Sequence, residues 1–173
     1  TVWGLRQVKT AYERAALQRS TDISADAHRA AMRATKPDRF EYEVEAALEK
    51  VYLERGAPSW GYPSIVGSGP NATILHYNRS SRKMKAGELL LIDAAAFSEG
   101  MTADITRAWP VSGKYSPEQA ELWRLVLAAQ EAGMKAAVAG NRTSDIEKAA
   151  EDVIKAGLLE LGLITDAASK QNR

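Results

Sequence analysis

The chain has 173 residues, of which 45% are apolar and 26% charged, values typical of one folded domain. Lysine and arginine total 23 and aspartate and glutamate total 22, which argues against a nucleic-acid-binding arm or an acidic tail. The absence of cysteine excludes disulfide bonds, thiolate zinc sites and a cysteine nucleophile. No apolar run approaches the ~20 residues of a membrane span, so we expect a cytoplasmic protein without membrane or nucleic-acid partners.

The first third of the sequence predicts two helices. Residues 8–35 are rich in alanine, leucine, arginine, glutamine and methionine, which favour helix, and Pro37 ends that stretch. Asp38 is followed three residues later by Glu41, the spacing of a capping box. We therefore expect a second helix of about four turns from this point to a C-terminal cap at Gly56.

The middle of the sequence predicts antiparallel strands. Short apolar runs at residues 73–77, 89–97 and 102–109 are bounded by glycine, asparagine, serine and proline. The last two runs are separated by only a few turn-compatible residues, so we expect them to form a hairpin.

The last third returns to helix. Ser116 is followed by Pro117 and Gln119, a strong helix start, and Ser144 with Glu147 has the spacing of another capping box. A polar tail, residues 165–173, is expected to be a loop. The whole pattern predicts an α+β fold in which helices flank an antiparallel sheet.

Asp93 and Asp104 are the most informative residues because each interrupts an apolar, strand-like run. A hairpin turn centred between Ser98 and Glu99 would place the two aspartates directly opposite each other, roughly 5 Å apart at Cβ. Like charges so placed repel, so either one is protonated or a cation lies between them. Oxygen ligands of this kind suit manganese, magnesium, calcium or zinc.

Other interpretations remain open from the residues alone. One aspartate could face solvent or pair with Arg107, and a turn shifted by one residue would send the two acids to opposite faces. His76, between apolar neighbours, and His28, on a helix, are both expected to serve packing or the surface. Tyr62 in a loop rich in glycine and proline is only a weak indication of a site.

Three sequence blocks resemble the Xaa-Pro aminopeptidase and prolidase family of metallopeptidases. They are residues 62–77 (YPSIVGSGPNATILHY), 87–96 (GELLLIDAAA) and 104–119 (DITRAWPVSGKYSPEQ). They occur in the order and at the spacing of that family, and the resemblance covers nearly the whole chain. Ala95 and Ala108 depart from it, since the family usually has glycine at the first position and often threonine at the second.

The resemblance implies half of a pita-bread fold with a site for two divalent metal ions, manganese first and zinc or cobalt as alternatives. It implies that Asp93 is a terminal ligand and Asp104 a bridging ligand. His76 would line the substrate pocket and assist proton transfer, and Tyr62 would be a pocket residue. The implied reaction is hydrolysis of the bond between an N-terminal residue and a following proline, as in an Xaa-Pro aminopeptidase or dipeptidase.

The family's remaining ligands, one histidine and two glutamates, are missing, because no histidine follows His76. We therefore expect residues 1–173 to be the N-terminal half of a catalytic domain, without the other half or the family's N-terminal regulatory domain. The start at Thr1, without a methionine, suggests a processed or truncated piece, inactive alone. The expected partners are a proline-containing peptide, a complementary C-terminal segment that supplies the missing ligands and, as a further possibility, a second copy in a homodimer.

Two alternatives remain. One is a non-catalytic domain of the same fold that binds peptides or proteins. The other is methionine aminopeptidase or creatinase-like activity on the shared scaffold. Retention of both Asp93 and Asp104 argues against the first, and the sequence around His76 favours the proline-specific enzymes.

Overall fold

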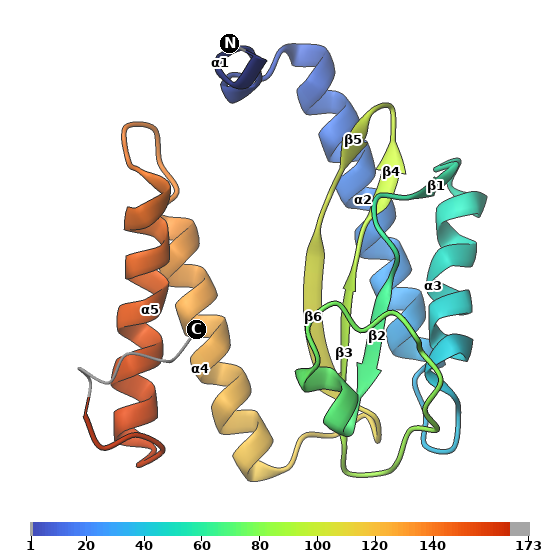
Figure 1. Cartoon of the computed structure of the whole chain (residues 1–173), viewed down its shortest axis with the longest axis vertical. Coiled ribbons are helices and arrows are strands. Elements are labelled where there is room, and N and C mark those ends of the chain that lie inside the picture. The colour runs from blue at the N-terminus through green and yellow to red at the C-terminus, as the bar shows by residue number, and fades with distance from the viewer. Residues whose placement is uncertain (1, 167–173) are drawn as a thin grey trace. The chain divides into compact units, whose positions relative to one another are not determined.

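The computed structural model describes residues 2–166 and divides into two compact units, Thr1–Tyr115 and Ser116–Arg173. The first unit begins with three helices, α1 (Val2–Gln7), α2 (Ala11–Ala34) and α3 (Glu41–Glu54) (Figure 1). A capping box starts α2, because the Thr10 hydroxyl accepts from the Glu13 amide while the Glu13 carboxylate accepts from the Thr10 amide. Gly56, with a φ of +81°, follows the end of α3 as predicted.

The strands of the first unit form two antiparallel three-stranded sheets. One has the order β1-β4-β5 and the other the order β2-β3-β6. The strands are β1 (Ser59–Trp60), β2 (Ile65–Ser68), β3 (Leu89–Ala94), β4 (Ala96–Ser98), β5 (Met101–Thr102) and β6 (Ile105–Pro110). The predicted hairpin is confirmed, but each of its arms is broken into two short strands, and β2 was not predicted.

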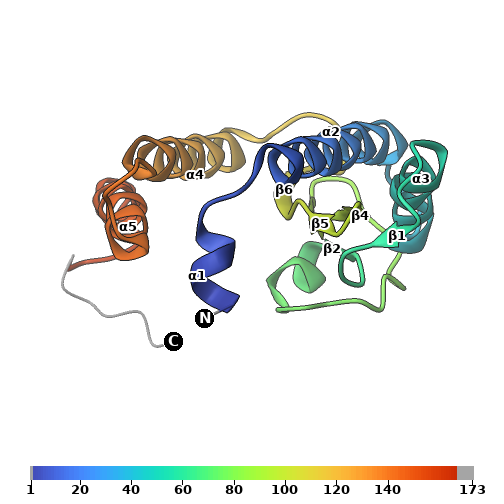
Figure 2. The same ribbon diagram turned by 90° about the horizontal axis from the view of Figure 1, so that it is seen from above.

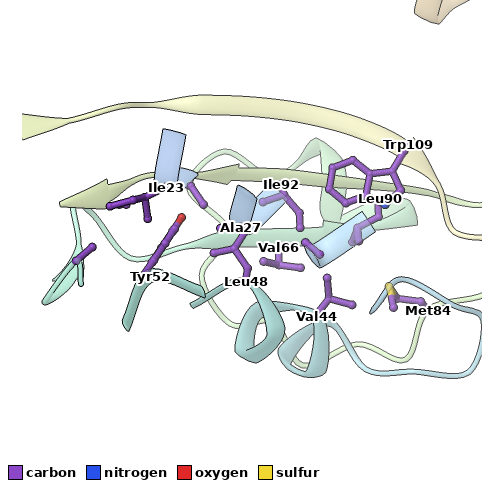
Figure 3. Close-up of a cluster of buried hydrophobic side chains, with 14 of the residues drawn as sticks. Ile23, Ala27, Val44, Leu48, Tyr52, Val66, Met84, Leu90, Ile92 and Trp109 are labelled. Atoms are coloured by element: carbon purple, nitrogen blue, oxygen red, sulfur yellow. The ribbon is translucent and has the colours of Figure 1, made fainter. Parts of the chain in front are cut away.

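The core of the first unit lies between the helices α2 and α3 and one face of the strands (Figure 2). Figure 3 shows side chains from both layers meeting there. The fully buried members include Ile23 and Leu48 from the helices and Leu90 and Ile92 from β3. Because alternate β3 residues face this core, Asp93 is turned to the opposite face.

The second unit is an antiparallel helix pair, α4 (Pro117–Ala136) and α5 (Thr143–Glu160), as Figure 1 shows. The predicted start of α4 is confirmed, since Ser116 caps the helix and Gln119 completes the box. The predicted start of α5 is two residues late, because the carboxylate of Asp145 accepts from the amide of Arg142 instead. No helix among residues 2–166 has the length and apolarity needed to cross a membrane. Most of the predicted polar tail lies outside the described residues.

The capping box predicted at Asp38 is wrong. Asp38 lies in a turn with a φ of +69° and its amide donates to the Met84 carbonyl (3.0 Å), while Phe40 pairs with Lys83. The helix instead begins at Glu41, and Glu43 accepts from the Phe40 amide (2.8 Å). Glu41 is thereby free to face the interior, where it is fully buried.

The strand predicted at residues 73–77 is also wrong. The 3-10 helix η1 (Gly69–Thr73) and a turn occupy this region, and Leu75 is 90% exposed. Gly69 and Pro70 favour a turn, and among the described residues the apolar residues that follow pair with no strand. His76 lies in this turn with a φ of +54°, a backbone conformation that residues other than glycine rarely adopt.

Candidate metal centre

The two aspartates lie on the same face of the hairpin, as predicted, but not directly opposite each other. The turn is formed by Glu99 and Gly100, which both have positive φ, and the pairing of β3 with β6 places Asp93 opposite Thr106. The register therefore differs by two residues from the predicted one. Because side chains alternate with a period of two, this shift leaves Asp104 on the face of Asp93, at a diagonal position.

The hydroxyl group of Tyr62 joins the two carboxylates. It lies within hydrogen-bond distance of Oδ1 of Asp93 and 2.9 Å from Oδ1 of Asp104. Since both oxygens contact the same atom, they are within about 6 Å of each other. Burial, followed by the hydrogen bonds to Asp93 and Asp104, raises the pKa of Tyr62, so the phenol stays protonated at neutral pH.

Gly61 allows Tyr62 to approach the hairpin so closely. The Gly61 amide donates to the Ala95 carbonyl (2.8 Å), which fixes the segment beside the broken edge of β3 and β4. A β-carbon at Gly61 would overlap the side chain of Thr102. Only glycine therefore fits here without displacing either the Thr102 side chain or the segment that carries Tyr62.

All four residues predicted for the site line one cavity of about 340 Å³. The cavity is lined by Tyr62, Pro63, Ile65, His76, Asn78, Asp93 and Asp104. His76 and Asp104 are exposed, whereas Tyr62 and Asp93 are half-buried. Because Asp104 is exposed, the free-energy cost of burying its carboxylate is smaller than the apolar residues beside it in the sequence suggested.

The loop that carries His76 is held by Glu41. The buried carboxylate accepts from the amide of Ser68 (2.7 Å), the hydroxyl of Tyr77 (2.8 Å) and the amide of Arg82 (2.9 Å). These donors lie on both sides of His76 in the sequence. The role of Glu41 escaped the sequence analysis, because its spacing from Asp38 suggested a cap.

The structure also decides whether Arg107 pairs with an aspartate and whether His28 lies in the core or on the surface. Arg107 donates to the carbonyl of Thr106 (2.7 Å), and among the described residues neither aspartate forms an ion pair. His28 is buried in α2, with Nδ1 2.9 Å from the Ser24 carbonyl oxygen, which confirms its packing role. Its burial lowers the pKa of the imidazole.

The donor set fits a divalent cation, although it is incomplete. A tyrosine hydroxyl has a single proton and can donate to only one acceptor at a time. The two carboxylates therefore have only one hydroxyl donor between them, and their negative charges are not balanced. A hard cation, which prefers oxygen ligands, would balance those charges. Among residues 2–166 no group of three or more histidine, aspartate or glutamate side chains could hold a metal ion alone. The remaining ligands would have to come from elsewhere.

Comparison with known proteins gives a consistent result. The model of metallopeptidase family M24 matches residues 15–170. The Xaa-Pro aminopeptidase of Haemophilus influenzae is 39% identical over 163 residues, which cover 92% of this chain and 37% of that protein. The Xaa-Pro aminopeptidase of Escherichia coli is 35% identical over 160 residues, covering 92% and 36%. This chain thus spans little more than a third of the length of the curated relatives it matches.

Solved structures match equally well. Aminopeptidase PepP of Pseudomonas aeruginosa superposes with a TM-score of 0.91 at 39% identity, covering 92% of this chain and 36% of that one. A Glu383Ala variant of Escherichia coli aminopeptidase P in complex with substrate gives a TM-score of 0.91 at 35% identity, covering 94% and 37%. A zinc-substituted form of the same enzyme in complex with product gives the same values.

Proposed function

The chain belongs to metallopeptidase family M24, and from this premise we propose that it is the N-terminal half of the catalytic domain of an Xaa-Pro peptidase. The α+β architecture and the structural matches agree with the prediction of half a pita-bread fold. The peptidase activity is supported by the names of the relatives, Xaa-Pro aminopeptidases. The single observation that carries the proposal is the convergence of Asp93 and Asp104 on one hydroxyl in a cavity.

In this proposal Asp93 and Asp104 are metal ligands, and the site is completed by a histidine and glutamates of a complementary C-terminal segment. Family membership supports divalent ions, and we propose manganese as the native metal, with zinc or cobalt as alternatives. When bound, two such ions supply Lewis acidity that activates water and stabilises negative charge on the scissile carbonyl. The chain alone, with two carboxylate ligands, is expected to be inactive.

Tyr62 holds the two carboxylates in place before metal is bound. Because burial and the two aspartates raise its pKa, Tyr62 remains a neutral donor and adds no negative charge to the site. Without this hydroxyl, the two carboxylates would be separated by their repulsion. Tyr62 thus keeps the ligands close to the geometry in which they can share a cation.

The role proposed for His76 is contact with the peptide substrate. Its imidazole is exposed at the rim of the cavity, and the loop on either side of it is fixed by hydrogen bonds to Glu41. We propose that His76 binds the substrate next to the scissile bond and transfers a proton there. A neutral imidazole can accept a proton at one nitrogen while it donates from the other.

The test is a peptidase assay on the complete catalytic domain that contains this chain, supplied with Mn²⁺. A peptide with proline in second position should be cleaved, and the same peptide with alanine there should not. Asp104→Asn should abolish metal loading and turnover together, because it removes one negative ligand. Absence of both metal and cleavage would favour the non-catalytic peptide-binding alternative, and absence of metal from an active domain would refute the site.

A further inference from the structure

The hairpin that carries both aspartates is interrupted at one place. In an antiparallel ladder, pairs that exchange two backbone hydrogen bonds alternate with pairs that exchange none. Counting from Ser98–Met101, which flank the two-residue turn, Ala96 and Ala103 should be a hydrogen-bonded pair. They are not paired: the ladder stops at Phe97–Thr102 and resumes at Ala94–Ile105.

Two serine hydroxyls of α2 take the place of the missing backbone bonds. The hydroxyl of Ser20 donates to the Ala96 carbonyl (2.7 Å) and accepts from the Ala103 amide (3.1 Å). Ser20 therefore bridges the two groups that would otherwise bond directly. The Ala96 amide donates to the hydroxyl of Ser24 (2.9 Å) instead of to the opposite strand.

Both serines are conspicuous in their surroundings. They are fully buried on a helix face that they share with three alanines, Ala16, Ala27 and Ala31, and with Ile23 and His28. Serine is a poorer helix former than alanine, and a buried hydroxyl costs free energy unless it is bonded. The spacing of four residues places Ser20 and Ser24 one turn apart, directly over the interruption.

Asp104 lies directly beside the interruption. Ala103, whose amide bonds to Ser20, faces the core and is 8% exposed, and Asp104 follows it outside any strand. We propose that Ser20 and Ser24 are positioning residues for Asp104. By opening the ladder at Ala96 and Ala103, they let the Asp104 carboxylate reach Tyr62 and Asp93. This inference deepens the proposed function and rests on it, because it concerns how a metal ligand is presented.

The first test reads the hydrogen bonds directly in the isotope-labelled 173-residue chain, by NMR scalar couplings across hydrogen bonds. In the wild type, no coupling is expected between the Ala103 amide and the Ala96 carbonyl, whereas the Ile92–Arg107 pair of the same ladder serves as the positive control. In Ser20→Ala the Ala103–Ala96 coupling should appear as the ladder closes. A coupling already present in the wild type would overturn the inference, even if the variant failed to fold.

The second test asks whether closing the ladder affects the site. Mn²⁺ is titrated into the complete catalytic domain that contains this chain, and line broadening of the Asp93 and Asp104 amides gives the affinity. Ser20→Ala should weaken binding about tenfold, as expected when a supporting residue of a metal site is lost. Thr35→Val is the matched control, because it also removes a buried hydroxyl, at the C-cap of α2, one that accepts from the Trp109 indole (3.0 Å) away from the interruption.

The outcomes separate this inference from the proposed function. If Ser20→Ala closes the ladder and binds Mn²⁺ as well as Thr35→Val does, the positioning role is refuted. If the complete wild-type domain binds no Mn²⁺, the metal proposal fails, and the ¹³Cζ chemical shift of Tyr62 becomes the readout. If the ¹³Cζ chemical shift of Tyr62 is the same in Ser20→Ala as in the wild type, the positioning role is refuted. A change of this chemical shift toward the value measured in Asp104→Asn would support it.

Discussion

Replacing Glu41 with glutamine should destabilise the first unit far more than the same replacement two residues later at Glu43. Glu41 is fully buried and accepts from the amide and hydroxyl of Ser68, the side chains of Asn71 and Tyr77, and the amide of Arg82. Glutamine can keep the acceptor that faces Ser68. Its NH₂ group would then face the Arg82 amide, which has no acceptor to offer.

The expected cost follows from those contacts. A hydrogen bond to a charged group contributes about 1.5–3 kcal/mol, and a buried donor left without a partner costs about 1–3 kcal/mol. We expect Glu41→Gln to lower the free energy of unfolding by about 3 kcal/mol, allowing for partial rearrangement of the Tyr77 hydroxyl. Glu43→Gln keeps an oxygen for the Phe40 amide and should cost less than about 1 kcal/mol.

Urea unfolding followed by circular dichroism measures both variants, and hydrogen exchange locates the loss. The amides of residues 69–82 should exchange faster in Glu41→Gln, because this loop loses its anchor, whereas those of α4 should not change. Equal destabilisation by the two substitutions would refute the view that Glu41 is a buried anchor rather than a helix cap.

Three further predictions concern the site and its surroundings. In the complete catalytic domain, Gly61→Ala should weaken Mn²⁺ binding about tenfold by displacing Tyr62, and a second substitution, Thr102→Ala, should restore part of it. Unchanged affinity in the single variant would contradict the packing argument. In the complete catalytic domain, His76→Ala should retain its metal and lose about 100-fold in kcat, and loss of metal would refute the role given to His76. Since burial lowers the pKa of His28 below its ordinary value of about 6.5, the unfolded chain binds more protons. Stability should therefore be fully present above that pH and fall as the pH drops through the folded pKa, and a His28→Gln variant, compared by urea unfolding, should lack this dependence.

The sequence predicted the paired aspartates correctly even though the assumed turn was wrong. The true turn uses Glu99 and Gly100, and an error of two residues in register leaves every side chain on its original face. The predicted helix start at Ser116 rests on groups only three residues apart, which makes it visible as a local pattern.

Features that depend on distant contacts could not be predicted in this way. Glu41 has the spacing of a capping residue but binds a loop that lies 27 to 41 residues away in sequence. Ser20 bonds to backbone groups 76 and 83 residues away, and its only local sign is the repeat of a serine on an alanine-rich helix face. The turn around His76 was mistaken for a strand because its exposed apolar residues mimic the composition of one.

Anomalous diffraction at the manganese edge tests the central claim most directly. Crystals of the complete catalytic domain grown with Mn²⁺ should show anomalous peaks within coordination distance of the carboxylates of Asp93 and Asp104, and Asp104→Asn crystals should lack them. A domain that cleaves Xaa-Pro peptides while those carboxylates carry no anomalous density would contradict it.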